Sequence, residues 1–304
     1  MTVKLSLGPI LYYWERERVL DFYAQAADWP VDIVYLGEVV CSKRRALRAD
    51  DWLGVAERLA GAGKEVVLST LALVEAESEL GAMRRAIGNG HFAVEANDAA
   101  ALNMLSAAAG ARFVAGSYLN VYNGETLDLL RELGAYRWVL PVELSRDMLA
   151  ALQARRPSGL ETEVLVFGRL PLALSARCFT ARAHNIPKDD CEFRCRDYPD
   201  GLALATREGN RFLTINGIQT QSGGSANLAG ALPELEKLGV DVARLSPQSR
   251  GMDEVVRLFR AAADGALAPA AAEQVIGALL PDGACNGYWR GEPGMAWQAA
   301  GLAD

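Results

Sequence analysis

Apolar residues along this chain gather in short runs, and most runs end at a glycine or a polar residue. Several runs contain few polar residues, which is typical of strands buried on both faces of a parallel sheet. Val31–Leu36, for example, is interrupted only by Asp32. From these runs we predict eight strands, at Val3–Leu7, Val31–Leu36, Glu65–Ser69, Phe92–Glu95, Arg112–Ala115, Trp138–Val142, Glu163–Phe167 and Val242–Leu245.

Segments with apolar residues at helical spacing separate the predicted strands. Asp50 and Asp51 suit the positive N-terminal end of a helix dipole, and Asp98 suits a helix N-cap. We predict one helix that begins at Asp50, and others over Arg16–Ala27, Glu75–Ile87, Asp98–Ala108, Glu125–Leu133, Arg146–Ala154, Met252–Ala263 and Ala270–Leu280.

The regular alternation of strands and helices predicts an α/β protein with a (β/α)8 TIM-barrel-like fold, as a single domain over residues 1–304. An open, doubly wound sheet is the alternative, but no G-x-G-x-x-G motif follows the first strand. Between the seventh and eighth strands, a cysteine-bearing insertion at residues 172–225 replaces the expected helix. It is long enough to lie across the barrel mouth, and residues 207–210 predict a hairpin turn within it. Residues 266–304 form a C-terminal extension.

The composition limits the class of protein further. Of the 304 residues, 51% are hydrophobic, which is typical of a globular protein with a large core. No apolar run approaches the ~20 residues of a membrane-spanning helix, and no signal peptide precedes the first strand. The net charge of −7 argues against nucleic acid as a partner, because binding phosphates requires excess positive charge. We therefore expect a soluble, cytoplasmic protein without a transmembrane segment.

Three of the five cysteines, Cys178, Cys191 and Cys195, lie in an arginine-rich part of the insertion. Cys41 follows the second predicted strand, and Cys285 lies near the end of the chain. Because a cytosolic chain keeps its thiols reduced and nearby cations favour thiolates, a metal site is preferred over a disulfide or unrelated core cysteines. The absence of C-x-x-C spacing favours an iron–sulfur cluster over zinc but leaves both open.

The order of the strands predicts where these cysteines meet. In a barrel of this class, the loops that follow the strands gather at the C-terminal end. Cys41 follows the second strand, whereas Cys178, Cys191 and Cys195 follow the seventh. We therefore expect the four sulfurs to converge above the barrel rim.

Motifs along nearly the whole chain carry a resemblance to a known family. They are SLGPILYYW, YLGEVVCSKRR, LSTLALV, LPVELSR, SARCFTARAHNIPKDDCEFRC, NGIQT, RLSPQ and CNGYWR. With them the chain resembles the ubiquinone-biosynthesis members of the collagenase-like peptidase family, which serve oxygen-independent hydroxylation. The resemblance implies a [4Fe–4S] cluster as cofactor, bound by Cys41, Cys178, Cys191 and Cys195, and it implies that Cys285 is not a ligand.

The same resemblance implies a function and partners. It implies one subunit of a hydroxylase that acts on prenylated aromatic precursors of ubiquinone, in a heterodimer with a homologous subunit. Relatives hydroxylate RNA bases, with prephenate implicated as the source of the hydroxyl group. The alternatives are a non-catalytic cluster-bearing partner, an RNA-hydroxylating protein and a peptidase. A peptidase is disfavoured because neither His91 nor His184 has an evident nucleophile partner and no H-E-x-x-H motif occurs.

Polar residues recur at the C-terminal ends of the predicted strands and suggest a polar cavity. They are Glu38, Ser69, Glu95, Asn97, Asn120, Glu143, Arg169, Arg177, Asn216 and Arg244. A carboxylate in such a position is a general base or a substrate anchor, or else one half of a structural ion pair. The catalytic candidates among them are Glu38, Glu95, Glu143, Arg177 and Asn120.

Overall fold

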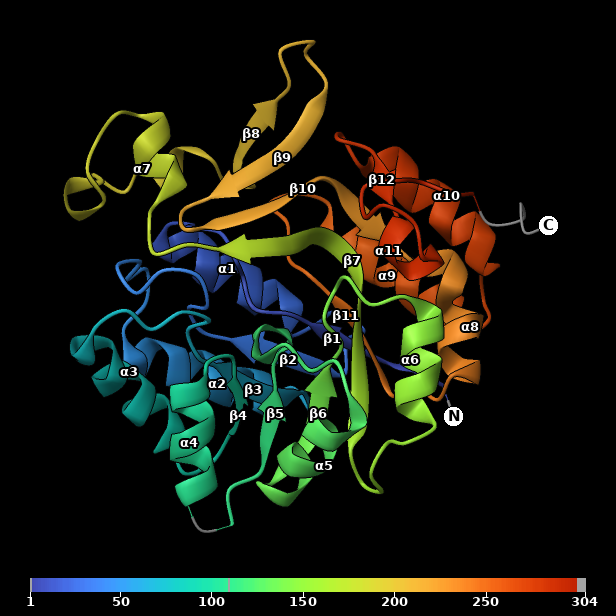
Figure 1. Cartoon of the computed structure of the whole chain (residues 1–304), viewed down its shortest axis with the longest axis horizontal. Coiled ribbons are helices and arrows are strands. Elements are labelled where there is room, and N and C mark those ends of the chain that lie inside the picture. Colours follow the sequence, from blue (N-terminus) through green and yellow to red (C-terminus); the bar gives the residue numbers. More distant parts are fainter. Residues whose placement is uncertain (1, 109, 300–304) are drawn as a thin grey trace.

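The computed structural model describes residues 2–108 and 110–299. Within these residues, eight parallel strands close into a barrel, in the order β11-β1-β2-β3-β4-β5-β6-β7, and β7 pairs with β11 to complete the ring (Figure 1). The predicted (β/α)8 TIM-barrel-like fold is therefore confirmed. The strands are β1 (Lys4–Leu7), β2 (Ile33–Leu36), β3 (Glu65–Ser69), β4 (Ala93–Ala96), β5 (Phe113–Ala115), β6 (Ala135–Val139), β7 (Glu161–Leu174) and β11 (Val242–Leu245).

Helices follow the strands and cover the outside of the barrel (Figure 1). The side chain of Asp98 accepts a hydrogen bond from the backbone N–H of Ala100, which confirms the predicted cap. Asp50 and Asp51 lie in the first turn of their helix, as expected. These helices are α1 (Arg16–Ala26), α2 (Ala49–Gly61), α3 (Glu77–Ile87), α4 (Ala99–Ala107), α5 (Gly124–Glu132), α6 (Arg146–Gln153), α8 (Leu232–Lys237) and α9 (Met252–Ala263).

Two strands differ from the prediction by three residues or more at one or both ends, and the other strand boundaries agree within two residues. The predicted strand Trp138–Val142 lies three residues too late, because β6 spans Ala135–Val139. This strand contains the fully buried Arg137, and a charged residue interrupts the apolar run from which a buried strand is predicted. The seventh strand was predicted to end at Phe167, but β7 continues to Leu174. It continues because its second half pairs antiparallel with a strand of the insertion.

The insertion at residues 172–225 consists of a short helix, a loop and an antiparallel sheet that extends the barrel wall. The predicted hairpin is confirmed: β8 (Leu202–Ala205) pairs antiparallel with β9 (Arg211–Asn216) and projects above the barrel (Figure 1). The glycine-rich residues 222–227 belong to β10 (Gln219–Asn227). They form a strand because β10 pairs with both β7 and β9. The helix is α7 (Phe179–Ala183).

The C-terminal extension packs against the insertion sheet and the side of the barrel. Its strand β12 (Ala284–Cys285) pairs with β10. The indole N–H of Trp289 donates to Glu234 and the side chain is buried, whereas Trp297 is largely exposed. The last residues of the expected 266–304 extension, 300–304, lie outside the described residues. The helices here are α10 (Pro269–Leu279) and α11 (Gly287–Arg290).

Apolar side chains fill the layer between the strands and the surrounding helices. A second, smaller apolar cluster lies on the other face of the strands, and it includes Ile33, Val67 and Val242. No helix in the described ranges is long and apolar enough to cross a membrane.

Gly37, directly after β2, is a position where only glycine fits. Its φ is +125°, and a Cβ there would lie 2.6 Å from the backbone oxygen of Ser69. We expect Gly37→Ala to destabilise the fold by about 1–3 kcal/mol, measured by urea unfolding. Gly61→Ala is the control, because a Cβ at Gly61 meets nothing within 4 Å. Equal unfolding midpoints for the two variants would contradict this expectation.

Candidate functional site: a cysteine site beside a barrel-mouth pocket

Four cysteines gather at the C-terminal end of the barrel, and we call Cys41, Cys178, Cys191 and Cys195 the cysteine site. Cys41 lies in the loop after β2, and the other three lie in the insertion. All four are partly buried and carry free thiols. The sulfur of Cys178 accepts the backbone N–H of Ala181 at 3.4 Å, which caps the first turn of α7.

Electrostatic interactions show how close these side chains lie. Burial raises the pKa of Cys41, and the charge of Cys178 raises it further. Burial also raises the pKa of Cys195, where Cys178 again adds to the shift. The pKa of Lys43 is raised, chiefly by its hydrogen bond to Asp189 and in smaller part by Cys191 and Cys41. The segment after β2 and the insertion therefore meet at this site.

Arg44 is the buried cation of the cysteine site. Its guanidinium donates to the backbone oxygen of Leu11 and to Oδ1 of Asn216, each at 2.7 Å. The positive charge of Arg44 and a hydrogen bond from it lower the pKa of Cys195, against the larger effect of burial. A buried guanidinium beside a thiol stabilises the thiolate that a metal requires.

Lys43 and Glu38 fix the loop that carries Cys41. Nζ of Lys43 donates to Asp189 at 2.7 Å, so this lysine ties the loop to the insertion. Glu38 accepts the backbone N–H groups of Val40 and Cys41 at 2.9 and 3.0 Å. Burial raises the pKa of Glu38, while Arg44 opposes the shift. Glu38 thus shapes the turn that places the Cys41 thiol.

The donor set is the part of this site that bears on which metal it could hold. Within residues 2–108 and 110–299, no three His, Cys, Asp or Glu side chains are grouped so as to hold a single metal ion. In a [4Fe–4S] cluster each cysteine binds a different iron, so the sulfurs are separated by the width of the cluster. Four thiols from two separate parts of the chain, with cations beside them, are a donor set of the kind that such a cluster uses.

Cys285 lies elsewhere, in β12 beneath the insertion sheet. Its side chain is fully buried, and burial raises the pKa of the thiol to about 11. A thiol of this kind stays protonated at neutral pH, which makes Cys285 a suitable control for the cysteine site.

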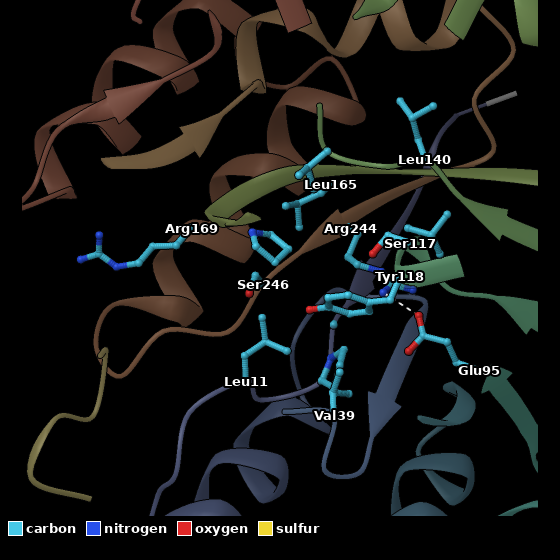
Figure 2. A pocket seen from close by; sticks show the side chains of 15 residues that line it. Leu11, Val39, Glu95, Ser117, Tyr118, Leu140, Leu165, Arg169, Arg244 and Ser246 are labelled. Carbon is cyan, nitrogen blue, oxygen red and sulfur yellow. Dashed lines mark hydrogen bonds and ion pairs between the residues drawn. The ribbon is translucent and has the colours of Figure 1, made fainter. Parts of the chain in front are cut away.

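A pocket opens at the C-terminal mouth of the barrel, and we call it the barrel-mouth pocket (Figure 2). Its cavity volume is about 40 Å³, within about 470 Å³ of empty space that includes open solvent. Nη1 of Arg244 donates to Glu95 at 2.8 Å, and the other oxygen of Glu95 accepts from Ser69 at 2.7 Å and Asn97 at 3.1 Å. Its wall includes Leu11, Glu95, Tyr118, Leu165, Arg244 and Ser246.

Beneath the pocket, a buried carboxylate holds the barrel interior together. Glu163 accepts Ser6 at 2.5 Å and Nε of Arg244 at 2.8 Å, and it also accepts the hydroxyl of Tyr35. Arg137 lies 3.9 Å away on its other side. Burial raises the pKa of Glu163, but the two arginines outweigh burial, and the pKa lies below its ordinary value of 4.5.

The lowered pKa of Glu163 predicts how acid affects stability. A carboxyl group whose pKa is lower in the folded state stabilises the fold fully above its ordinary pKa of 4.5, and the contribution is lost as the pH falls through the lowered value. Between about pH 5 and pH 3, wild type should therefore lose more unfolding free energy than Glu163→Gln does, measured by urea unfolding. If wild type and Glu163→Gln lost equal unfolding free energy over this pH range, the acid sensitivity would come from other carboxylates and the expectation would be wrong.

A chain of buried hydrogen bonds links the cysteine site to the barrel-mouth pocket. Arg44, which contacts Cys195, donates to Asn216, and Asn216 donates to Oε1 of Gln219 at 3.3 Å. Nε2 of Gln219 then donates to the hydroxyl of Tyr118 at 2.8 Å, in the pocket wall. The two sites are thus joined through polar side chains of β9 and β10.

Sequence reasoning found only part of this chain. It selected Asn216 but missed Arg44, Tyr118 and Gln219. One signal for this chain was available in the sequence: polar residues recur around a turn, at Asn216, Gln219 and Gln221. Polar residues at such spacing can share one face of a hairpin and bond to one another.

The remaining candidates lie in different places. Glu143 is exposed and bonds the hydroxyl of Tyr122, while Asn120 and Arg177 are also exposed. The structure therefore brings Glu95, Ser69, Asn97 and Arg244 together but leaves these three residues outside the pocket wall. Arg169 contributes to the wall, yet its guanidinium points away to Asp282 and to the carbonyl groups of Ser222 and Gly223 (Figure 2).

Comparisons with known proteins give a family and a set of similar folds. The sequence profile described as Peptidase family U32 matches residues 15–298. The chain is similar to the U32 peptidase Mk0906, with 10% identity, a TM-score of 0.45, and coverage of 82% of this chain and 94% of that chain. It is also similar to a mutant tryptophan synthase α-subunit from Pyrococcus furiosus, with 10% identity, a TM-score of 0.44, and coverage of 90% and 98%.

Proposed function

This chain belongs to peptidase family U32, and from this premise we propose that it is a UbiV-like [4Fe–4S] subunit of an oxygen-independent hydroxylase that acts on ubiquinone precursors. The observation that carries the proposal is the cysteine site itself. Two separate segments bring four partly buried thiols to the C-terminal end of the barrel, where Arg44 and Lys43 would offset the negative charge of the thiolates that bind a cluster.

In this proposal Cys41, Cys178, Cys191 and Cys195 hold the cluster, which supplies one-electron transfer when bound. Because each iron takes one cysteine, the irons have no open position, and electron transfer or a structural role is favoured over Lewis-acid chemistry. Arg44 would keep the Cys195 thiolate charged, and Lys43 would hold the insertion against the loop after β2. Burial of the site would limit access of water and oxygen.

We further propose a homologous UbiU-like subunit as partner, in a cytoplasmic heterodimer. Exposed aromatic and aliphatic side chains on the insertion, Phe193, Leu204 and Phe212, support an interface there, since aromatic residues are enriched in interface cores. The proposed substrate is a prenylated aromatic ring, with prephenate as a possible hydroxyl donor.

Anaerobic purification tests this proposal. The chain, prepared with and without its partner, should contain roughly four irons and four sulfides per chain and show a reducible brown chromophore. The pair should then hydroxylate a prenylated phenol without oxygen. Zinc in place of iron, or a colourless chain, would overturn the proposal. Turnover by the partner alone would assign this chain the alternative role, that of a non-catalytic cluster-bearing subunit.

A further inference from the structure

We propose that the barrel-mouth pocket is a second site, separate from the cysteine site, and that it binds a small apolar ring through one oxygen acceptor held by Arg244 and Tyr118. The inference rests on the pocket's own side chains and would stand if the chain held no cluster. The ligand class is a ring that carries a carboxylate, carbonyl or phenolic oxygen.

Arg244 supplies the first argument. Its side chain is more than nine-tenths buried and lines the pocket, with Nε and Nη1 engaged by Glu163 and Glu95. Nη2 is also buried, yet it has no hydrogen-bond partner among the described residues. A buried N–H without a partner costs free energy, which a ligand oxygen in the pocket would recover. Cζ of the guanidinium lies over the ring of Tyr35, 4.0 Å from its centroid, and the bonds at Nε and Nη1 fix the direction of Nη2.

Tyr118 supplies the second argument. Its hydroxyl oxygen accepts from Gln219 at 2.8 Å, which leaves the O–H hydrogen available to donate. Figure 2 shows the phenol ring of Tyr118 crossing the pocket between Leu11 and Arg244. Burial raises the pKa of Tyr118, so the hydroxyl keeps its hydrogen at neutral pH. Two donors thus serve the same space.

The apolar side chains of the pocket wall are the reason that we propose a ligand with an apolar ring. The side chains of Leu11, Val39, Leu140 and Leu165 surround the polar groups. An apolar pocket with a few polar groups is the usual form of a small-molecule site, in which polar contacts orient the ligand.

Charge limits the ligand further. Glu95 and Glu163 offset Arg244 and Arg137 within the barrel, and Asp282 offsets Arg169. A balanced site of this kind suits a neutral or singly charged ligand, whereas a phosphate dianion would introduce uncompensated buried charge.

Binding of three small probes tests the proposal. Benzoate, phenol and toluene share a ring and differ in the oxygen, and their dissociation constants for the purified full chain can be measured by ligand-detected NMR. We expect benzoate or phenol to bind at least tenfold more tightly than toluene, because only they offer an acceptor. Which of the two binds more tightly identifies the oxygen as carboxylate or hydroxyl.

Two variants place binding in this pocket. Tyr118→Phe removes one donor and keeps the ring, and we expect it to weaken benzoate or phenol roughly tenfold. Val142→Phe adds bulk to the pocket wall and should abolish binding. Tyr122→Phe is the matched control, because this tyrosine bonds Glu143 on the surface.

Two results would overturn the proposal. One is no binding of either oxygen-bearing probe to the wild-type chain, or toluene binding as tightly as they do. The other is unchanged affinity in both Tyr118→Phe and Val142→Phe.

Discussion

Cys41→Ala should lose the iron–sulfur cluster that we propose and, with it, hydroxylation by the proposed pair. Cys41 comes from a different part of the chain than its three partners, so no neighbouring thiol can take its place. Iron in anaerobically purified protein is expected to fall from roughly four per chain to near zero. Iron analysis and the visible absorption spectrum measure this directly, before any assay of activity.

Cys285→Ala is the control for this experiment. The thiol of Cys285 is fully buried in β12, outside the cysteine site. The variant should therefore keep the iron content of wild type. If Cys41→Ala retained a full complement of iron, or if Cys285→Ala lost it, the assignment of the ligands would be wrong.

Glu163→Ala should be among the most destabilising single substitutions in the barrel. Removing this carboxylate takes one of two ion-pair partners from the buried Arg244, takes the fully buried partner from Arg137, and removes the acceptor for Ser6. Loss of one partner from a buried ion pair costs about 3–5 kcal/mol. Because Glu95 and Glu161 stay paired with these arginines, we expect a loss at the lower end of that range. Urea unfolding should show this loss, provided that the variant accumulates in folded form.

Glu125→Ala provides the comparison. Its partner Arg155 lies on the surface, and both side chains are mostly exposed, so solvent screens the pair. The unfolding midpoint of Glu125→Ala should stay close to that of wild type. A similarly small effect in Glu163→Ala would show that the interior arginines are solvated or paired in another way.

The barrel could be predicted from the sequence because its strands are apolar and its connections regular. The pattern predicted all eight strands, and Met252–Ala263 coincides with α9. It failed where charge enters the interior, as at Arg137 in β6, because partners distant in the sequence stabilise that charge. It also missed the second half of β7, whose pairing with β10 depends on tertiary contacts.

The cysteine site could be predicted from the sequence, whereas its connection to the barrel-mouth pocket could not. Cysteine spacing and strand order placed the four cysteines at one end of the barrel, and the structure brings Cys178 near both Cys41 and Cys195. The path to the pocket could not be predicted, since Tyr118 and Gln219 are 101 residues apart. No local pattern relates two such residues, and only the folded barrel brings them together.

The continuity of β7 has a mechanical consequence. A single strand forms part of the barrel wall and then, without a break, one side of the insertion sheet. The base of the insertion therefore cannot move as a hinged lid, because such a motion would break the backbone hydrogen bonds between β7 and β10. The projecting hairpin and the cysteine-bearing loop are the segments above the rim that are free of this constraint, so we expect them to control entry to the barrel.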